Sequence, residues 1–232
     1  ITDIHNSFIE AGADVIQTNT FGGNRIKLSK YNLGNNVENI NRAAVINAKN
    51  AAVSGAKIAL SVGPTGKILE PWGQFSFDEA VAVFTEQICV ALLEAPDLII
   101  IETMTQLAEA RAALLAARSL TDIPIVTTMA FENNGRTTFG TSPKAAAIAL
   151  RAMGADLAGV NCVGDIGVIS GIVKEMTSAL GMPVIAQPNA GNPHFRGGQT
   201  FFPSTPETFA TDCEKLSELG AGFLGGCCGT TP

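Results

Sequence analysis

Two adjacent cysteines, Cys227 and Cys228, stand between glycines in the stretch Gly225–Gly229 of this 232-residue sequence. A third cysteine, Cys162, follows the apolar run Gly159–Asn161. If both runs are strands of one barrel, three thiolates meet at the same rim. Three protein ligands and one open position are typical of a catalytic zinc site, whereas a structural zinc site has four protein ligands. The pattern therefore predicts a Zn²⁺ centre formed by the three cysteines.

The two other cysteines fit a structural role. Cys89 lies in an apolar run and Cys213 lies in a predicted helix near the end of the chain. A lone cysteine is most often a small buried hydrophobic residue. Five cysteines are also an odd number, which is a poor basis for a disulfide framework. We therefore expect reduced thiols and a cytoplasmic location.

The elements that must position these thiols are short apolar runs, which read as strands buried on both faces of a parallel sheet. Seven such runs alternate with helical patterns, as in repeated right-handed βαβ units. The predicted strands are Asp14–Thr18, Lys57–Val62, Leu98–Glu102, Ile123–Ala130, Leu157–Asn161, Val184–Gln187 and Gly222–Leu224.

Amphipathic segments between the strands predict helices. Ser76 and Glu79 form a capping-box pattern, and Ser142-Pro143 and Thr205-Pro206 place a cap before a first-turn proline. The predicted helices are Asp3–Ala11, Val37–Ser54, Phe77–Glu94, Leu107–Ser119, Pro143–Met153, Gly167–Leu180 and Pro206–Leu219.

This α/β order predicts a (β/α)₈ TIM barrel that lacks its first strand and its last helix in this chain. We expect residues 1–232 to form one barrel domain, and the chain to be a fragment or module of a longer one. An open doubly wound sheet is the alternative, but no Gly-x-Gly-x-x-Gly motif opens a helix.

The overall composition argues against several classes of protein. The formal net charge of −6 argues against a nucleic-acid-binding surface, which would be basic. The sequence contains no run of eighteen apolar residues that would predict a membrane span, and no secretory signal is visible.

In a TIM barrel, the active site is formed by the loops that follow the strands. Glu102 ends one strand, and reads either as a solvated strand end or as an anion that binds an ammonium group or a proton. A competing interpretation concerns Gly225-Gly226, since late loops of such barrels often bind phosphate. That reading would give a phosphate-binding lyase or isomerase with incidental cysteines, although no lysine is placed for a Schiff base.

Several motifs together resemble the homocysteine S-methyltransferase family, and the resemblance covers nearly the whole chain. Within the family, the chain is most like the homocysteine-binding domain of cobalamin-dependent methionine synthase. The motifs that carry the resemblance are Asp14–Phe21, Gly63–Gly66, Ile101–Thr103, Gly159–Cys162, Gln187–Gly191 and Gly225–Pro232.

The resemblance implies a zinc-dependent methyltransferase. Zinc would be held by Cys162, Cys227 and Cys228, with Asn189 as a possible fourth ligand before homocysteine arrives. Glu102 would hold the substrate amino group. Further substrate contacts are expected from Asn19, Thr20, Gly63 and Asn161. The zinc-bound homocysteine thiolate would attack the methyl group to give methionine, without a separate protein nucleophile.

The methyl donor is left open by the sequence. The resemblance favours methylcobalamin charged by methyltetrahydrofolate, through corrinoid and folate modules in other domains or partner proteins. A stand-alone enzyme could instead use S-methylmethionine, betaine or another methylated corrinoid. A non-catalytic module that binds homocysteine or zinc is a further alternative.

Overall fold

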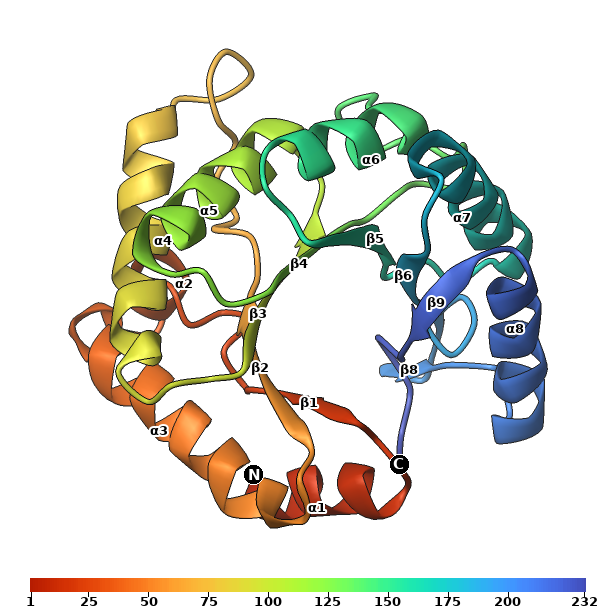
Figure 1. The fold of residues 1–232 in the computed structure, drawn as a ribbon, viewed down its shortest axis with the longest axis horizontal. Coiled ribbons are helices and arrows are strands. Elements are labelled where there is room, and N and C mark those ends of the chain that lie inside the picture. Colours follow the sequence, from red (N-terminus) through yellow and green to blue (C-terminus); the bar gives the residue numbers. More distant parts are fainter.

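The structure is a computed structural model that describes residues 1–232, apart from the side chain of Ser54. Seven parallel strands curl around a central axis, and the helices lie outside them (Figure 1). The strands are β1 (Val15–Gln17), β2 (Lys57–Val62), β3 (Leu98–Met104), β4 (Ile125–Met129), β5 (Leu157–Asn161), β6 (Val184–Gln187) and β9 (Ala221–Leu224).

All seven predicted strands are therefore confirmed, with changes at their ends. Strand β4 is shorter than the predicted range and begins after Pro124, which has no N–H group for a sheet hydrogen bond. Strand β3 continues beyond Glu102 to Met104, through a shift in its register with β4.

The order of the strands identifies a barrel-type sheet. Each strand pairs in parallel with the next, in the order β1-β2-β3-β4-β5-β6-β9, without the reversal of strand order that marks a doubly wound sheet. Within the described residues, β1 and β9 are the two edge strands. The prediction of a TIM-barrel fold is confirmed, and the open edges lie where the sequence predicts an additional strand.

The predicted helices are also present, and Ser76, Ser142 and Thr205 cap α4, α6 and α8 as expected. None of the helices in the described part of the chain is long and apolar enough to cross a membrane. The helices are α1 (Thr2–Glu10), α3 (Val37–Ala51), α4 (Phe77–Leu92), α5 (Leu107–Leu120), α6 (Pro143–Ala152), α7 (Ile166–Leu180) and α8 (Pro206–Glu218).

Some short elements were not predicted. A helix of five residues, α2 (Arg25–Ser29), follows β1, and two 3₁₀ turns, Gly34–Asn36 and Ala52–Ser54, flank α3. An antiparallel hairpin of β7 (His194–Arg196) and β8 (Gln199–Phe201) stands in the loop before α8. Its turn contains two glycines at positive φ, which is a hairpin signal that the polar composition of this loop concealed.

Alternation along the strands separates the helix-facing core from the inside of the barrel. Outward side chains, including Leu60, Val62, Ile99 and Ile101, pack with the helices in the main core. Inward side chains form a second apolar cluster of Ala59, Ile100, Val126 and Leu157. Further along these four strands, the inward positions carry polar side chains. On β2, β3 and β4 the polar residue comes two positions after the apolar one, and on β5 it comes four positions after. These polar residues are Ser61, Glu102, Thr128 and Asn161. Polar groups therefore gather inside the barrel near the carboxyl ends of its strands.

Candidate metal centre

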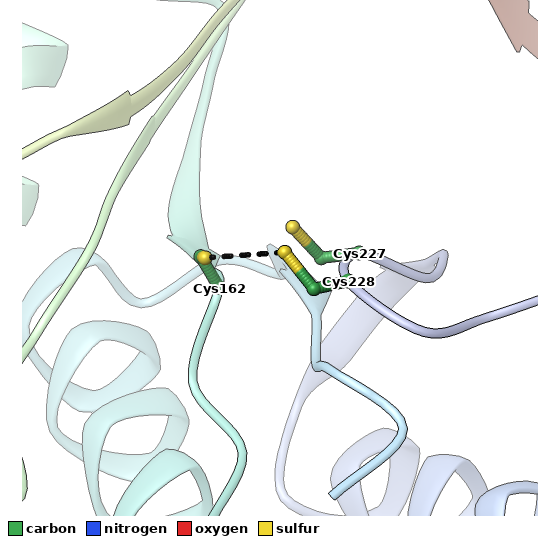
Figure 2. A group of neighbouring side chains, drawn as sticks. All are labelled: Cys162, Cys227 and Cys228. Carbon is green, nitrogen blue, oxygen red and sulfur yellow. Dashed lines mark hydrogen bonds between the residues drawn. The ribbon is translucent and has the colours of Figure 1, made fainter. Parts of the chain in front are cut away.

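Three thiols from two distant segments meet at this end of the barrel. The sulfur atoms of Cys162, Cys227 and Cys228 all lie within 4.8 Å of one another, and the Cys162 and Cys228 sulfurs are 3.8 Å apart. Figure 2 shows Cys162 approaching from one segment and the adjacent pair from the other. We call these three residues the cysteine cluster. Cys89 and Cys213 lie on α4 and α8, outside the cluster. Cys89 is exposed on its helix, so the expectation that it is a buried hydrophobic residue is wrong.

The spacing of the sulfurs fits zinc. A tetrahedral zinc ion with Zn–S bonds of about 2.3 Å places two of its sulfurs about 3.8 Å apart. The Cys162–Cys228 distance of 3.8 Å has this value. Three sulfurs leave one tetrahedral position for another ligand, so the donor set fits a site that can take a substrate atom.

The backbone at the end of β5 turns the Cys162 side chain into the cluster. Cys162 follows Asn161 directly and has a φ of 61°, in the left-handed region that side-chain-bearing residues rarely adopt. Its N–H donates to the carbonyl oxygen of Gln187, the last residue of β6. A strained conformation of this kind persists only where its surroundings hold it.

The Cys227-Cys228 pair lies on a loop that is fastened to the end of β6. Strand β9 ends at Leu224, so the regular strand stops before the pair. This is required if two adjacent thiols are to point toward the same site. The N–H groups of Gly225 and Cys227 donate to the carbonyl oxygens of Ala186 and Pro188. The Cys228 N–H donates to Asn189 Oδ1 at 3.0 Å.

Gly229 allows the chain to leave the cluster. Its φ of 82° favours glycine, and a Cβ there would come within 2.2 Å of the Phe202 ring. Phe202 follows β8, so the unpredicted hairpin packs against the cysteine loop through this contact.

The thiols influence one another's protonation. The neighbouring Cys227 thiol lowers the pKa of Cys162, against the opposing effect of burial. The same interaction with Cys162 and burial raise the pKa of Cys227, and the Glu102 carboxylate contributes to this rise. Negative charge therefore concentrates first on Cys162, and Glu102 lies close enough to act on the cluster.

Glu102 is a buried carboxylate inside the barrel, with only 8% of its surface exposed. Burial raises its pKa, and a hydrogen bond from Ser61 Oγ at 2.5 Å partly offsets that rise. It is therefore not a solvated strand end. Of the two readings that the sequence leaves open, the structure favours an anion that faces an enclosed polar site.

A chain of buried hydroxyl groups supports this carboxylate. Thr18 and Thr20 share a hydrogen bond of 2.7 Å between their hydroxyl oxygens. The Ser61 N–H donates to Thr18 Oγ1, and the Thr20 hydroxyl donates to the Ser61 carbonyl oxygen. Ser61 is thus fixed on both of its backbone polar groups while its side chain holds Glu102.

The other predicted substrate residues lie in different surroundings. Asn19 is exposed on the loop after β1, whereas Thr20 is buried in the hydroxyl network. Gly63 is buried, and its N–H donates to the carbonyl oxygen of Phe21. Asn189 is nearly buried and holds Cys228, and Asn161 is fully buried beside the cluster.

A cavity of about 460 Å³ opens beside the cysteine cluster. Cys162, Cys228 and Asn189 lie on one part of its wall, and Phe131 and Phe202 add aromatic surface. A small ligand in this cavity would touch sulfur on one side and apolar rings on another. The cluster is therefore reachable from outside the barrel.

Three residues that surround the site rather than belong to it were missed from the sequence: Ser61, Thr103 and Thr128. Each contacts Glu102 or Asn161 by a hydrogen bond. The available signal was a polar residue within an otherwise apolar strand, since such a side chain must find a partner inside the barrel.

The sequence of this chain is similar to a described family and to named relatives. The sequence model of a family described as "Homocysteine S-methyltransferase" matches residues 1–232. Methionine synthases of Mycobacterium leprae and Mycobacterium tuberculosis are each 29% identical to this chain over 241 aligned residues. The alignments cover 99% of this chain but only 20% of the length of those relatives.

Solved structures support the fold. The metallated form of the homocysteine methyltransferase MmuM from Escherichia coli superposes with a TM-score of 0.84 at 18% identity. The match covers 100% of this chain and 80% of MmuM.

Proposed function

Because this chain belongs to the homocysteine S-methyltransferase family, we propose that it binds zinc through Cys162, Cys227 and Cys228 and methylates homocysteine to methionine. The observation that carries this proposal is the convergence of three sulfurs within 4.8 Å, with room for one more ligand. Bound there, zinc would lower the pKa of a thiol at the remaining position and so keep its sulfur in the nucleophilic thiolate form.

Glu102 is proposed to bind the ammonium group of homocysteine. Its carboxylate is buried, close to the cluster and held by Ser61. A cation brought next to a buried carboxylate favours the ionised form and offsets the cost of burial. The amino group and the sulfur of one small amino acid would then be held at two points, which orients the sulfur toward the methyl donor.

Asn189 is proposed as the ligand that takes the fourth position before homocysteine arrives. Its side chain lies beside Cys162, and its Oδ1 accepts a hydrogen bond from the Cys228 N–H, so a potential oxygen ligand is already next to the cysteine cluster. Asn19, Thr20 and Gly63 are proposed to shape the substrate site, with Thr20 and Gly63 acting through the packing of the loops after β1 and β2.

The methyl donor is proposed to be methylcobalamin, charged by methyltetrahydrofolate. The mycobacterial relatives are named methionine synthase, and this chain spans a fifth of their length. We infer that corrinoid and folate modules, in other domains or in partner proteins, supply the methyl group. The proposed site of action is the cytoplasm, where thiols such as these stay reduced.

The hydrogen bonds around Gly225 do not favour a phosphate site. The N–H groups of Gly225, Cys227 and Cys228 already donate within the protein. A phosphate-binding loop needs such groups to point toward the ligand. A lyase or isomerase that uses this loop is therefore not our proposal.

The test is methionine formation from homocysteine by the zinc-loaded chain. Methylcobalamin, S-methylmethionine and betaine are supplied in separate reactions. Methionine from methylcobalamin alone supports the proposed donor, and methionine from another donor keeps the methyltransferase but replaces the donor. Tight homocysteine binding without methionine from any donor would leave a non-catalytic binding module.

A further inference from the structure

Asn161 occupies an unusual place for an asparagine side chain. It is the last residue of β5, directly before Cys162, and none of its surface is exposed. Its Oδ1 accepts hydrogen bonds from the Thr103 N–H and the Thr128 hydroxyl, both at 2.9 Å. Its Nδ2 donates to Thr103 Oγ1 at 2.7 Å and to Cys227 Sγ at 3.7 Å. The amide therefore has two partners for each of its polar atoms.

These partners fix which way the amide points. The Thr103 backbone N–H can only donate, so the atom that faces it must be the Asn161 oxygen. The NH₂ group must then face the other side, where Cys227 lies. The direction of the N–H···S contact therefore follows from a backbone group whose polarity is fixed.

The same amide also holds the segment that carries Glu102. Register between β3 and β4 shifts between Ile101 and Met104, and Thr103 has a φ of 61°. Thr103 therefore has no paired residue on β4. Its N–H donates instead to the side-chain oxygen of Asn161, which lies on β5. One side chain thus links the carboxylate-bearing end of β3 to a sulfur of the cysteine cluster.

We propose that Asn161 is a positioning residue of the metal centre, which donates an N–H···S hydrogen bond to the Cys227 thiolate when metal is bound. The inference rests on the proposed function, because it assumes the metal site. Three thiolates around one divalent cation carry a net negative charge, and an N–H donor stabilises it. The polar atoms of Asn161 already have partners and its surface is buried, so this role acts through the metal ligand Cys227. The expected contact of Asn161 with homocysteine stays a separate prediction.

The expected loss of metal affinity can be taken from other metal sites, where residues that hydrogen-bond to the metal ligands have been removed. Removal of such a partner weakens metal binding by about 10- to 100-fold. The substitution Asn161→Asp keeps the shape and the acceptor oxygen, but places a second oxygen against the Cys227 sulfur. We expect it to weaken metal binding within that range.

The matched control is Thr128→Val. Thr128 is as buried as Asn161 and belongs to the same network, but its hydroxyl bonds only the Asn161 oxygen. This substitution removes a hydrogen bond while it leaves the N–H···S contact in place. Any loss that is merely structural should therefore appear in both variants.

The experiment is a titration with Co²⁺, followed by the sulfur-to-cobalt charge-transfer band. Loss of the N–H donor raises the energy of the sulfur electrons, so the band of Asn161→Asp should move to longer wavelength with weaker binding. The band of Thr128→Val should match the wild type. A wild-type band and affinity in Asn161→Asp would overturn the inference, although the proposed function would stand.

The wild-type chain gives a second test that needs no substitution. In protein loaded with an NMR-active cadmium isotope, the metal should show scalar coupling to a side-chain NH₂ proton of Asn161, through the N–H···S bond. Cadmium coupled to cysteine protons but not to this amide would overturn the inference alone. A folded wild-type chain that binds neither cobalt nor cadmium would overturn the metal centre and the inference with it.

Discussion

The two sides of the barrel rim position their functional groups in different ways. On one side, the cysteine cluster sits on the loops after β5 and β9, where Cys162 and Gly229 adopt positive φ and backbone hydrogen bonds fasten the loops to β6. On the other side, Glu102 sits on β3 and is held by the side chain of Ser61 on the neighbouring strand β2.

The loop side, which carries the cysteine cluster, and the strand side, which carries Glu102 and Ser61, have different tasks. Loops can bring several sulfurs to one point, because their backbone is free to turn. Strands instead place a side chain at a fixed depth inside the barrel, where a carboxylate is shielded from water. We therefore expect changes on the loop side to abolish metal binding, and changes on the strand side to weaken recognition of the amino acid while the metal stays.

The largest effect is expected from Cys227→Ser. This substitution removes a metal ligand, so zinc affinity should fall by more than the roughly 100-fold that a ligand's hydrogen-bonding partner contributes. Turnover should be lost with the metal. Zinc content after gel filtration and methionine formation measure both.

The matched control is Cys89→Ser, since Cys89 is exposed on α4. It should keep zinc and turnover, with stability within about 0.5 kcal/mol of the wild type. If Cys227→Ser kept both zinc and turnover, the cysteine cluster would not be the metal centre.

Glu102→Gln should have the next largest effect. Loss of a charged hydrogen bond costs about 1.5–3 kcal/mol, which corresponds to roughly 10- to 100-fold weaker homocysteine binding. Zinc content should be unchanged, because Glu102 lies outside the cysteine cluster. Calorimetric titration with homocysteine measures the change.

A thiol of the same length without the amino group serves as the control ligand. It should bind the wild type and Glu102→Gln equally well, because it has no ammonium group for Glu102. If the substitution weakened this ligand as much as homocysteine, Glu102 would not be the ammonium-binding group.

Ser61→Ala should give a smaller change of the same kind. The carboxylate stays but loses the donor that fixes it, so homocysteine binding should weaken by up to about 10-fold. Ser61→Thr, which keeps a hydroxyl, is expected to restore part of the affinity. If Ser61→Ala bound homocysteine as tightly as the wild type, Ser61 would not position Glu102 for homocysteine binding.

The dependence of stability on pH should reveal the buried carboxyl. Burial raises the pKa of Glu102 above its ordinary value of 4.5. As the pH rises above 4.5, the unfolded chain loses this proton while the folded chain keeps it, so the folded state loses stability until its own pKa is passed.

Glu102→Gln cannot titrate at this position. The free energy of unfolding of the metal-free wild type, minus that of Glu102→Gln, should therefore fall with pH across this window and then level off. Glu109, another buried carboxyl with a raised pKa, is present in both chains and cancels in the difference. A difference that rose with pH would contradict the buried state of Glu102.

The loop side of the site could largely be predicted from the sequence. Adjacent cysteines framed by glycines are a local signal, and the recurring apolar runs show that their loops end strands of one sheet. The break after Leu224 follows from the need to turn two neighbouring side chains toward one point.

The strand side could be predicted only in part. Glu102 stands out as an acid at the end of an apolar run, but its partner Ser61 is 41 positions away. Pairing of this kind depends on the register of two strands, which no local pattern specifies. For the same reason, the links of Asn161 to Thr103 and to Cys227, 58 and 66 positions away, emerge only from the structure.

The central claim is that three cysteines hold zinc with one position left for the sulfur of homocysteine. The most direct test is metal analysis of the reduced chain, with zinc-edge X-ray absorption before and after homocysteine is added. We predict about one zinc per chain with three sulfur neighbours, rising to four with homocysteine. A folded chain without zinc, or a sulfur count that homocysteine leaves unchanged, would contradict the claim.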